Sequence, residues 1–228
     1  NTCKLLPEQL EADKIGFVLA PRINAAGRVG KADLAVELLI TEDEARAQEI
    51  AALLENENTV RKNIEKQILE EAGQAAGQCS DQVMVLSGEW HPGIIGIVAS
   101  RLVDTYYRPV VMIAFQDGQG RGSCRSVAGF DIYQALLQCA DLLLHFGGHS
   151  QAAGFGILPE NLEAFRQRLN DIAEKVLPPE ALVPELQIDA LVSLAEVDFG
   201  LVEELKRLAP FGMGNAAPLL ACENLQVS

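Results

Sequence analysis

The chain has 228 residues, 49% of them hydrophobic, which is enough for one large domain or for a medium domain with a partial second one. Its formal net charge of −14 at first sight disfavours a nucleic-acid partner, because binding to phosphates depends on Lys and Arg. No apolar run approaches the roughly 20 residues that a membrane-spanning helix needs. The five cysteines are widely spaced without a Cys-x-x-Cys pair, which predicts neither a disulfide framework nor a zinc site and favours a reducing cytoplasm.

The first forty residues predict a short helical entry segment. They lack an initiating methionine and the apolar core of a signal peptide, so we expect further chain before Asn1. Pro21 and Gly27 punctuate a stretch that we expect to be a loop opening a short helix. This stretch places Arg22, Asn24 and Arg28 close together, which is compatible with anion binding and equally with a salt-bridge cluster.

A long helix is predicted next. Thr41 and Glu44 match a Thr-x-x-Glu capping box, and the pairs Glu42 with Arg46 and Glu57 with Arg61 have the i,i+4 spacing that stabilises helices. We expect the helix to reach about Ala72 and to stop at Gly73 or Gly77. Its length suits a connector between two regions, although a plain core helix fits the periodicity equally well.

From Gln82 onwards, strand and helix patterns alternate, which predicts an α/β fold with a small mixed sheet of roughly four strands flanked by helices. The expected strands are Val83 to Leu86, Pro109 to Phe115, Gly122 to Val127 and Ala152 to Ile157. The expected helices are Ile94 to Tyr106, Asp131 to Leu144 and Leu162 to Val176. Leu177-Pro178-Pro179 marks a boundary, after which Leu186 to Val192, a helix around Val202 to Leu208 and Leu219 to Val227 begin a further β unit.

The acidic excess is unevenly distributed. Between Val85 and Ile157 five acidic residues face four arginines, so this region is close to neutral, whereas residues 40–72 and 159–207 carry most of the negative charge. We therefore expect the acidic residues to coat helices away from a ligand-binding face.

Three glycine-rich turns lie in or near the neutral region: Trp90 to Gly96, Gly122 to Ser126 and Phe146 to His149. Ser123 and Arg125 are two residues apart, which places both on one face of a strand as a phosphate clamp; a surface salt bridge is the alternative for Arg125. His149 suits a hydrogen bond to a phosphate or to a catalytic group, His91 is open between ligand and structural roles, and His145 suits a structural role at a helix end. The histidines have no metal-ligand spacing.

These segments, together with Ala20 to Arg28 and Pro210 to Asn215, resemble in family order the RecJ single-strand DNA exonucleases of the DHH phosphoesterase superfamily. The resemblance spans nearly the whole chain. It implies that residues 1–40 are the tail of a DHH domain, 41–78 the connector helix, 79–178 the DHH-associated (DHHA1) domain, and 179–228 the start of an OB-like domain.

The resemblance also implies roles for individual residues. Ser123 and Arg125 should hold DNA phosphates, and His91 and Asn24 should also contact the substrate. Arg22 and Arg28 should approach the strand near the active cleft, and Gly147, Gly148 and His149 should face the scissile region, with His149 as the catalytic residue. Cys124 replaces the small residue expected between Ser123 and Arg125, which puts the tightness of that turn in question.

Manganese or magnesium would be held by the DHH domain of the full-length protein, because this sequence contains no Asp-His-His triplet and no Asp-x-Asp motif. We therefore expect no metal in this chain. The expected function is the substrate-binding part of a 5′-to-3′ single-stranded-DNA exonuclease in recombination and repair, inactive alone, with single-strand binding protein or a helicase as further partners. The alternatives are a phosphodiesterase for short oligonucleotides or cyclic dinucleotides, and a catalytically dead protein-binding scaffold.

Overall fold

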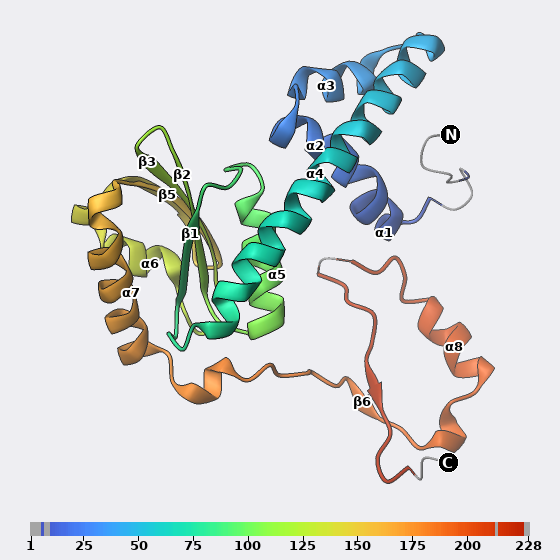
Figure 1. Cartoon of the computed structure of the whole chain (residues 1–228). Coiled ribbons are helices and arrows are strands. Elements are labelled where there is room, and N and C mark those ends of the chain that lie inside the picture. Colours follow the sequence, from blue (N-terminus) through green and yellow to red (C-terminus); the bar gives the residue numbers. More distant parts are fainter. Residues whose placement is uncertain (1–5, 7–9, 213, 226–228) are drawn as a thin grey trace. The chain divides into compact units, whose positions relative to one another are not determined.

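The computed structural model describes residue 6, residues 10–212 and residues 214–225 (Figure 1). The chain forms two compact units, one of residues 57–184 and the other of residues 1–56 together with 185–228. The boundary between them falls inside the longest helix, α4 (Glu44–Gln78).

The unit of residues 57–184 is built on a five-stranded mixed sheet in the order β1-β2-β3-β5-β4. Only β1 and β2 are parallel, and the other neighbours pair antiparallel. The strands are β1 (Met84–Gly88), β2 (Val110–Gln116), β3 (Gln119–Arg125), β4 (Leu143–His149) and β5 (Ala152–Ile157). This confirms the predicted α/β class, with one strand more than the sequence predicts.

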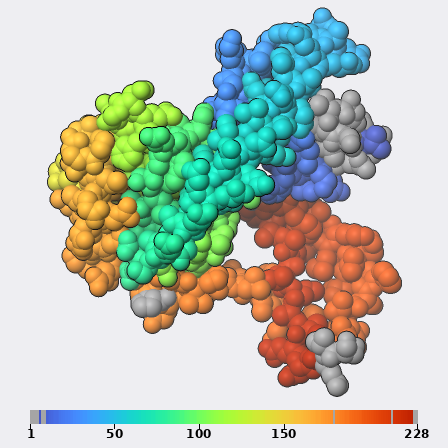
Figure 2. Space-filling view, in the orientation of Figure 1, coloured from blue at the N-terminus to red at the C-terminus, as the bar shows by residue number. Residues whose placement is uncertain are grey.

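Helices cover one face of this sheet and form the main core. They are α6 (Ile132–Leu137) and α7 (Leu162–Val176), followed in the same unit by short 3-10 turns at Ala140–Leu142, Pro159–Asn161 and Pro179–Leu182. The aromatic rings of Phe155 on β5 and Phe165 on α7 lie 4.9 Å apart at the centre of the core. Figure 2 shows α7, in gold, packed directly against the neighbouring yellow-green segments.

The helix α5 (Ile95–Tyr106) lies on the opposite face, where it contacts β2 and β3 (Figure 1). The second half of α4 runs along α5. The Tyr106 hydroxyl donates to the Gly73 carbonyl oxygen at 3.4 Å, and Arg101 of α5 pairs with Glu65 of α4. Trp90, which precedes α5, is buried and donates from Nε1 to Glu71 Oε2 at 2.9 Å.

The other unit contains the N-terminal helices and the C-terminal segment. The helices are α1 (Ala12–Lys14), a π-helical turn (Ile15–Leu19), α2 (Ala20–Val29) and α3 (Ala32–Ile40). Ala26, Ala35, Ile50 and Leu54 form a small core between α2, α3 and the start of α4. The prediction of a loop at Pro21 to Gly27 is wrong, because Pro21 occupies the first turn of α2, where its missing N–H costs nothing.

The C-terminal segment contains α8 (Phe199–Lys206), a 3-10 turn (Leu194–Glu196) and a parallel pair of short strands, β6 (Ala190–Leu191) and β7 (Leu220–Ala221). The predicted strand from Leu219 extends to Val227, which lies outside the described residues. Within the described part of the chain, none of the helices combines the length and the apolar character required to cross a membrane.

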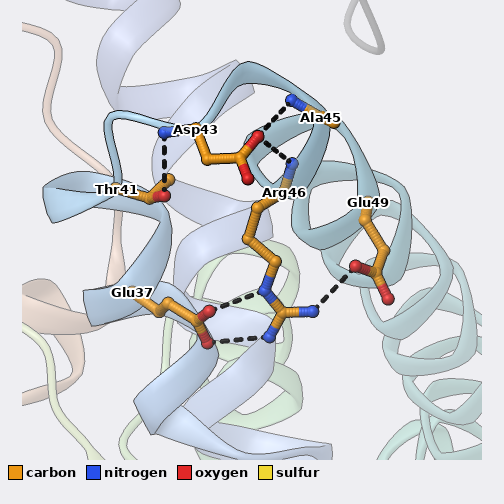
Figure 3. Close-up of polar contacts among 6 residues, drawn as sticks. All are labelled: Glu37, Thr41, Asp43, Ala45, Arg46 and Glu49. Carbon is orange, nitrogen blue, oxygen red and sulfur yellow. Dashed lines mark hydrogen bonds and ion pairs between the residues drawn. The ribbon is translucent and has the colours of Figure 1, made fainter.

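The start of α4 differs from the predicted capping box (Figure 3). Asp43, not Thr41, accepts hydrogen bonds from the first free N–H groups of the helix, those of Ala45 at 2.9 Å and Arg46 at 3.2 Å. The Thr41 hydroxyl accepts instead from the Asp43 N–H at 3.2 Å. Asp is as good an N-cap as Thr or better, so the cap lies two residues further along the chain than predicted.

The predicted charge pairs of α4 are also wrong. Arg46 makes a two-bond contact with Glu37 of α3 and a further bond with Glu49 (Figure 3), and Arg61 pairs with Glu65 instead of Glu57. The helix continues through Gly73 and Gly77 to Gln78, because packing on α5 outweighs the roughly 1 kcal/mol that each glycine costs.

The region from Asp131 to His149 holds the largest error of the sequence analysis. The predicted helix from Asp131 to Leu144 ends at Leu137, and Leu143 to His149 form the edge strand β4. Of the three glycine-rich segments, Gly122 to Arg125 and Phe146 to His149 therefore lie in strands, and only Trp90 to Ile94 forms a loop.

Candidate nucleic-acid interface

Strand β3 separates its glycines from its polar side chains. Gly122 faces the core so closely that a Cβ atom there would lie 2.3 Å from the Phe155 ring. Cys124 is fully buried on the same side, and burial raises the pKa of its thiol well above the usual range. Because side chains alternate along a strand, Arg121, Ser123 and Arg125 all point to the opposite face. The polar residues of this motif thus share one surface. Cys124 lies within a strand, so there is no turn at this position for it to distort.

The start of α5 lies directly over two of these side chains. A Cβ atom at Gly96 would lie 2.9 Å from Ser123 Oγ and 3.1 Å from an Arg125 nitrogen. Arg125 Nη1 donates to Ser123 Oγ at 3.3 Å and to the Cys124 carbonyl oxygen at 2.7 Å. No side chain caps the helix at Ile94. A guanidinium, a hydroxyl and the positive end of a helix dipole therefore converge, an arrangement that favours a bound anion.

The register of the sheet extends this surface to β4. Each polar position of β3 lies opposite a small residue of β5, which in turn lies opposite a residue of β4. The three resulting rows are Arg125, Ala152 and His149; Ser123, Gly154 and Gly147; Arg121, Gly156 and His145. We call these nine residues the open face.

The middle strand of the open face carries no side chain larger than a methyl group. Ala152, Gly154 and Gly156 therefore form a shallow trough between polar residues on β3 and β4. Since neighbouring strands are about 4.8 Å apart, Arg125 and His149 have Cα atoms about 10 Å apart across this trough. An extended polyanion can lie in it with cationic and hydrogen-bonding groups on both sides.

Two histidines use the same ring nitrogen in a local hydrogen bond. His91 Nδ1 accepts a hydrogen bond from the Gly93 N–H at 3.1 Å, and His149 Nδ1 accepts from the Gln151 N–H at 3.4 Å. In the neutral imidazole the proton then resides on Nε2. Each ring can therefore donate from Nε2 to a phosphate oxygen.

Gly148 is required by the backbone just before His149. Its φ angle is 149°, and a Cβ atom there would lie 2.5 Å from the Ala152 carbonyl oxygen and the Ala153 Cα. A side chain would force β4 away from β5 at this end and would displace His149. Gly147, by contrast, has open space around its Cα and leaves the trough unobstructed.

Arg22, Asn24 and Arg28 lie on α2, in the other unit. Arg22 contacts Glu55 through Nε and, at 3.2 Å, through Nη2, and it donates to the Val18 carbonyl oxygen at 2.6 Å. Binding of a phosphate by Arg22 therefore requires it to exchange the Glu55 carboxylate for the ligand. The structure thus brings together His91, Ser123, Arg125, Gly147, Gly148 and His149 in one unit.

The sequence analysis missed the small residues of β5 and two polar residues of the open face, Arg121 and His145. His145 was assigned to a helix end because the predicted helix ran into Leu144. The period-two spacing of His145, Gly147 and His149 is the signal that could have indicated a strand with one polar face.

Among the residues that the structure describes, no group of three or more His, Cys, Asp and Glu side chains could hold a divalent metal ion. The polar side chains of the open face, two arginines, a serine and two histidines, are of the kinds that favour anions.

Two domain families match the sequence: the DHHA1 domain at residues 80–175 and the RecJ OB domain at residues 188–228. Single-stranded-DNA-specific exonuclease RecJ of Bacillus subtilis is 39% identical over 217 residues, which cover 93% of this chain and 28% of that protein. The RecJ proteins of Thermus thermophilus and Escherichia coli are 37% and 33% identical and are covered to 30% and 39% of their lengths. The chain therefore spans about a third of the length of these relatives.

Solved structures of RecJ proteins also resemble this chain. The crystal structure of T. thermophilus RecJ with Mn²⁺ superposes with a TM-score of 0.81 at 36% identity over 93% of this chain and 32% of the other. The same protein with Mg²⁺ gives 0.80 over 92% of this chain and 33% of the other. A further exonuclease RecJ structure bound to manganese gives 0.65 over 75% of this chain and 43% of the other.

Proposed function

The chain belongs to the RecJ family, and from this membership we propose that it is the substrate-binding portion of a 5′-to-3′ single-stranded-DNA exonuclease that acts in recombination and repair. The observation that carries the proposal is the open face, where Ser123 and Arg125 lie at the start of α5, which no side chain caps, beside the small residues Ala152 and Gly154. The relatives are named for single-stranded DNA, and this surface has the polyanion-binding chemistry that such a substrate requires.

In this proposal each residue has a binding role. Arg125 and Ser123 hold oxygens of one phosphate, assisted by the N–H groups at the start of α5. His91 and His149 donate from Nε2 to phosphate oxygens, and His149 contacts the phosphate that is cleaved. Gly147 and Gly148 let the strand approach the sheet, and Arg22, Asn24 and Arg28 contact the strand from the other unit.

Metal chemistry belongs in this proposal to the DHH domain of the full-length protein, which would hold Mn²⁺ or Mg²⁺. Such ions activate water against a phosphodiester. No step assigned to this chain involves them. Three further points are predictions from the resemblance to RecJ: the domain limits given above, a cytoplasmic location, and a single-strand binding protein or helicase as partner.

The experiment that tests the proposal is a binding titration of a 5′-phosphorylated single-stranded oligonucleotide over a series of salt concentrations. Arg125→Ala should weaken binding roughly tenfold or more, because a hydrogen-bonded charge contact contributes about 1.5–3 kcal/mol. The salt dependence should also become shallower by about 0.7 in the log–log slope, the value for one lost phosphate contact with a single strand.

Arg168→Ala is the matched control. Arg168 lies on α7 at the opposite face of the sheet, pairs with Asp141, and loses the same charge on substitution. It should leave binding unchanged. If the wild-type chain shows no salt-dependent binding even at low salt, the substrate-binding role is wrong and the protein-binding scaffold is favoured.

A further inference from the structure

Arg121 stands apart from the other arginines. It is exposed on β3, and within the described part of the chain it is the only arginine without a hydrogen-bond or ion-pair partner. An exposed guanidinium held on a rigid strand, with no carboxylate on it, is available to a ligand.

His145 faces Arg121 across the trough. The His145 ring fills the space above Gly156, where a Cβ atom would lie 2.5 Å from Cε1. The ring is exposed, and among the described residues it has no hydrogen-bond partner. Gly156 thus gives the imidazole a fixed place on the sheet with its polar atoms free.

A cavity of about 640 Å³ opens between these two residues. Its walls include Arg121, His145, Pro92, Gln116, Asp117 and Gln119. The volume lies within the range of about 300–1,000 Å³ that is usual for small-molecule sites. The cavity combines a cation for a phosphate, a flat ring and a proline for an apolar surface, and two amides for the polar edge of a base.

We propose that this Arg121–His145 pocket binds one nucleotide of the same DNA strand that Ser123 and Arg125 hold. The phosphate contacts Arg121, the base packs on His145 and Pro92, and the amides of Gln116 and Gln119 bond the edge of the base. The Asp117 carboxylate can accept hydrogen bonds from amino groups of the base, and it disfavours a second phosphate. The inference rests on the proposed function.

The two sites should take separate nucleotides. Arg121 and Arg125 are four residues apart on an extended strand, roughly 13 Å. Because Arg125 is held by its bonds to Ser123 Oγ and the Cys124 carbonyl oxygen, we expect Arg121 to contact a different phosphate, so that a longer strand fills both sites. The pocket therefore extends the surface that binds the DNA strand and is not a separate site for free nucleotides.

The test compares Arg121→Gln with Arg168→Gln in binding a single-stranded oligonucleotide of about 12 nucleotides, within the usual size of such sites. Both variants lose one charge, but only Arg121→Gln should weaken binding, by roughly tenfold. Gly156→Ala, which displaces the His145 ring without changing the charge, should also weaken it. A 5′-mononucleotide should bind the wild type far more weakly than the oligonucleotide.

The three histidines of the chain allow a direct readout, because an NMR spectrum of the imidazole rings contains only three sets of signals. DNA should shift the His145 signals, and unchanged signals of His91 and His149 in the free variants show that the fold is intact. The inference is overturned if Arg121→Gln binds like Arg168→Gln, if the His145 signals do not respond to DNA, or if a mononucleotide binds the pocket as tightly as the strand.

The two proposals fail differently. Binding that is weakened by Arg125→Ala but not by Arg121→Gln overturns the pocket and leaves the proposed function standing. An absence of binding by the wild-type chain, or indifference to Arg125→Ala, overturns the proposed function and the pocket with it.

Discussion

At the scale of single residues, Gly96 determines how closely helix α5 approaches the side chains of Ser123 and Arg125. A methyl group at this position would have to displace Ser123 Oγ, at 2.9 Å, and Arg125, at 3.1 Å. The sequence showed Ser123 and Arg125 as a pair on one strand face, but not their contact with Gly96, since that contact joins elements 27 residues or more apart. Local periodicity carries no information about such contacts.

Substitution of Gly96 separates binding from stability. Gly96→Ala should leave the thermal stability close to that of the wild type, because the roughly 1 kcal/mol that alanine gains over glycine in a helix offsets the cost of displacing Ser123 and Arg125. The affinity for single-stranded DNA should nevertheless fall severalfold, because Ser123 and Arg125 must move. Thermal unfolding by circular dichroism and fluorescence anisotropy measure the two effects.

Gly73→Ala serves as its control, because Gly73 lies in α4 with open space around its Cα. It should gain the same helix propensity and bind DNA like the wild type. Equal affinities of Gly96→Ala and the wild type would show that the approach of α5 does not shape the site.

At the scale of elements, most of the sheet of residues 57–184 could be predicted, and β4 could not. The apolar residues of α5 and α7 follow the helical period, and β2 is a continuous apolar run. In β3, buried and more exposed residues alternate in spite of the glycines. In β4 the run Leu142 to Leu144 continues a helical pattern, and a register shift between Leu143 and His145 interrupts the alternation. The strand is stabilised by pairing with β5, a tertiary effect that overrides local propensity.

A buried charge cluster holds α5 against α4 at the same scale. Glu65 is 4% exposed and accepts from Arg61 at 2.5 Å and from Arg101 of α5. Glu65→Ala should lower the free energy of unfolding by about 3–5 kcal/mol, because it leaves Arg61, itself 9% exposed, without a counter-charge. Urea unfolding followed by circular dichroism measures this loss.

Glu70→Ala on the same helix is the comparison. Glu70 forms an exposed pair with Lys66 at 3.8 Å, and such pairs contribute at most about 1 kcal/mol. Similar losses for the two variants would mean that the Glu65 cluster adds no more than a surface pair does.

For the whole molecule, the distribution of charge matters more than its sum. The net charge of −14 coexists with an open face that has two arginines and no carboxylate among its nine residues. Arg101 and Arg108, the other arginines of this region, bind Glu65 and the carbonyl oxygens of Cys79 and Asp81. The sequence predicted a neutral region with four arginines, but only packing could show which two of them lie on the open face.

The chain should bind DNA without cleaving it. With Mn²⁺ or Mg²⁺ added, we expect no release of nucleotides from a single-stranded oligonucleotide. Metal-dependent hydrolysis needs carboxylate and imidazole ligands grouped around the ion, and the part of the chain that the structure describes contains no such group. Release of acid-soluble nucleotides, at protein concentrations that saturate binding, is the measurement.

Two controls identify the source of any activity: a reaction with EDTA added, and a reaction with the variant Arg125→Ala. A contaminating nuclease would be inhibited by EDTA but indifferent to Arg125→Ala. Degradation that requires the metal and falls with Arg125→Ala in parallel with binding would come from this chain itself. That result would contradict the proposal that this part of the protein binds the DNA strand while the DHH domain binds the metal ions.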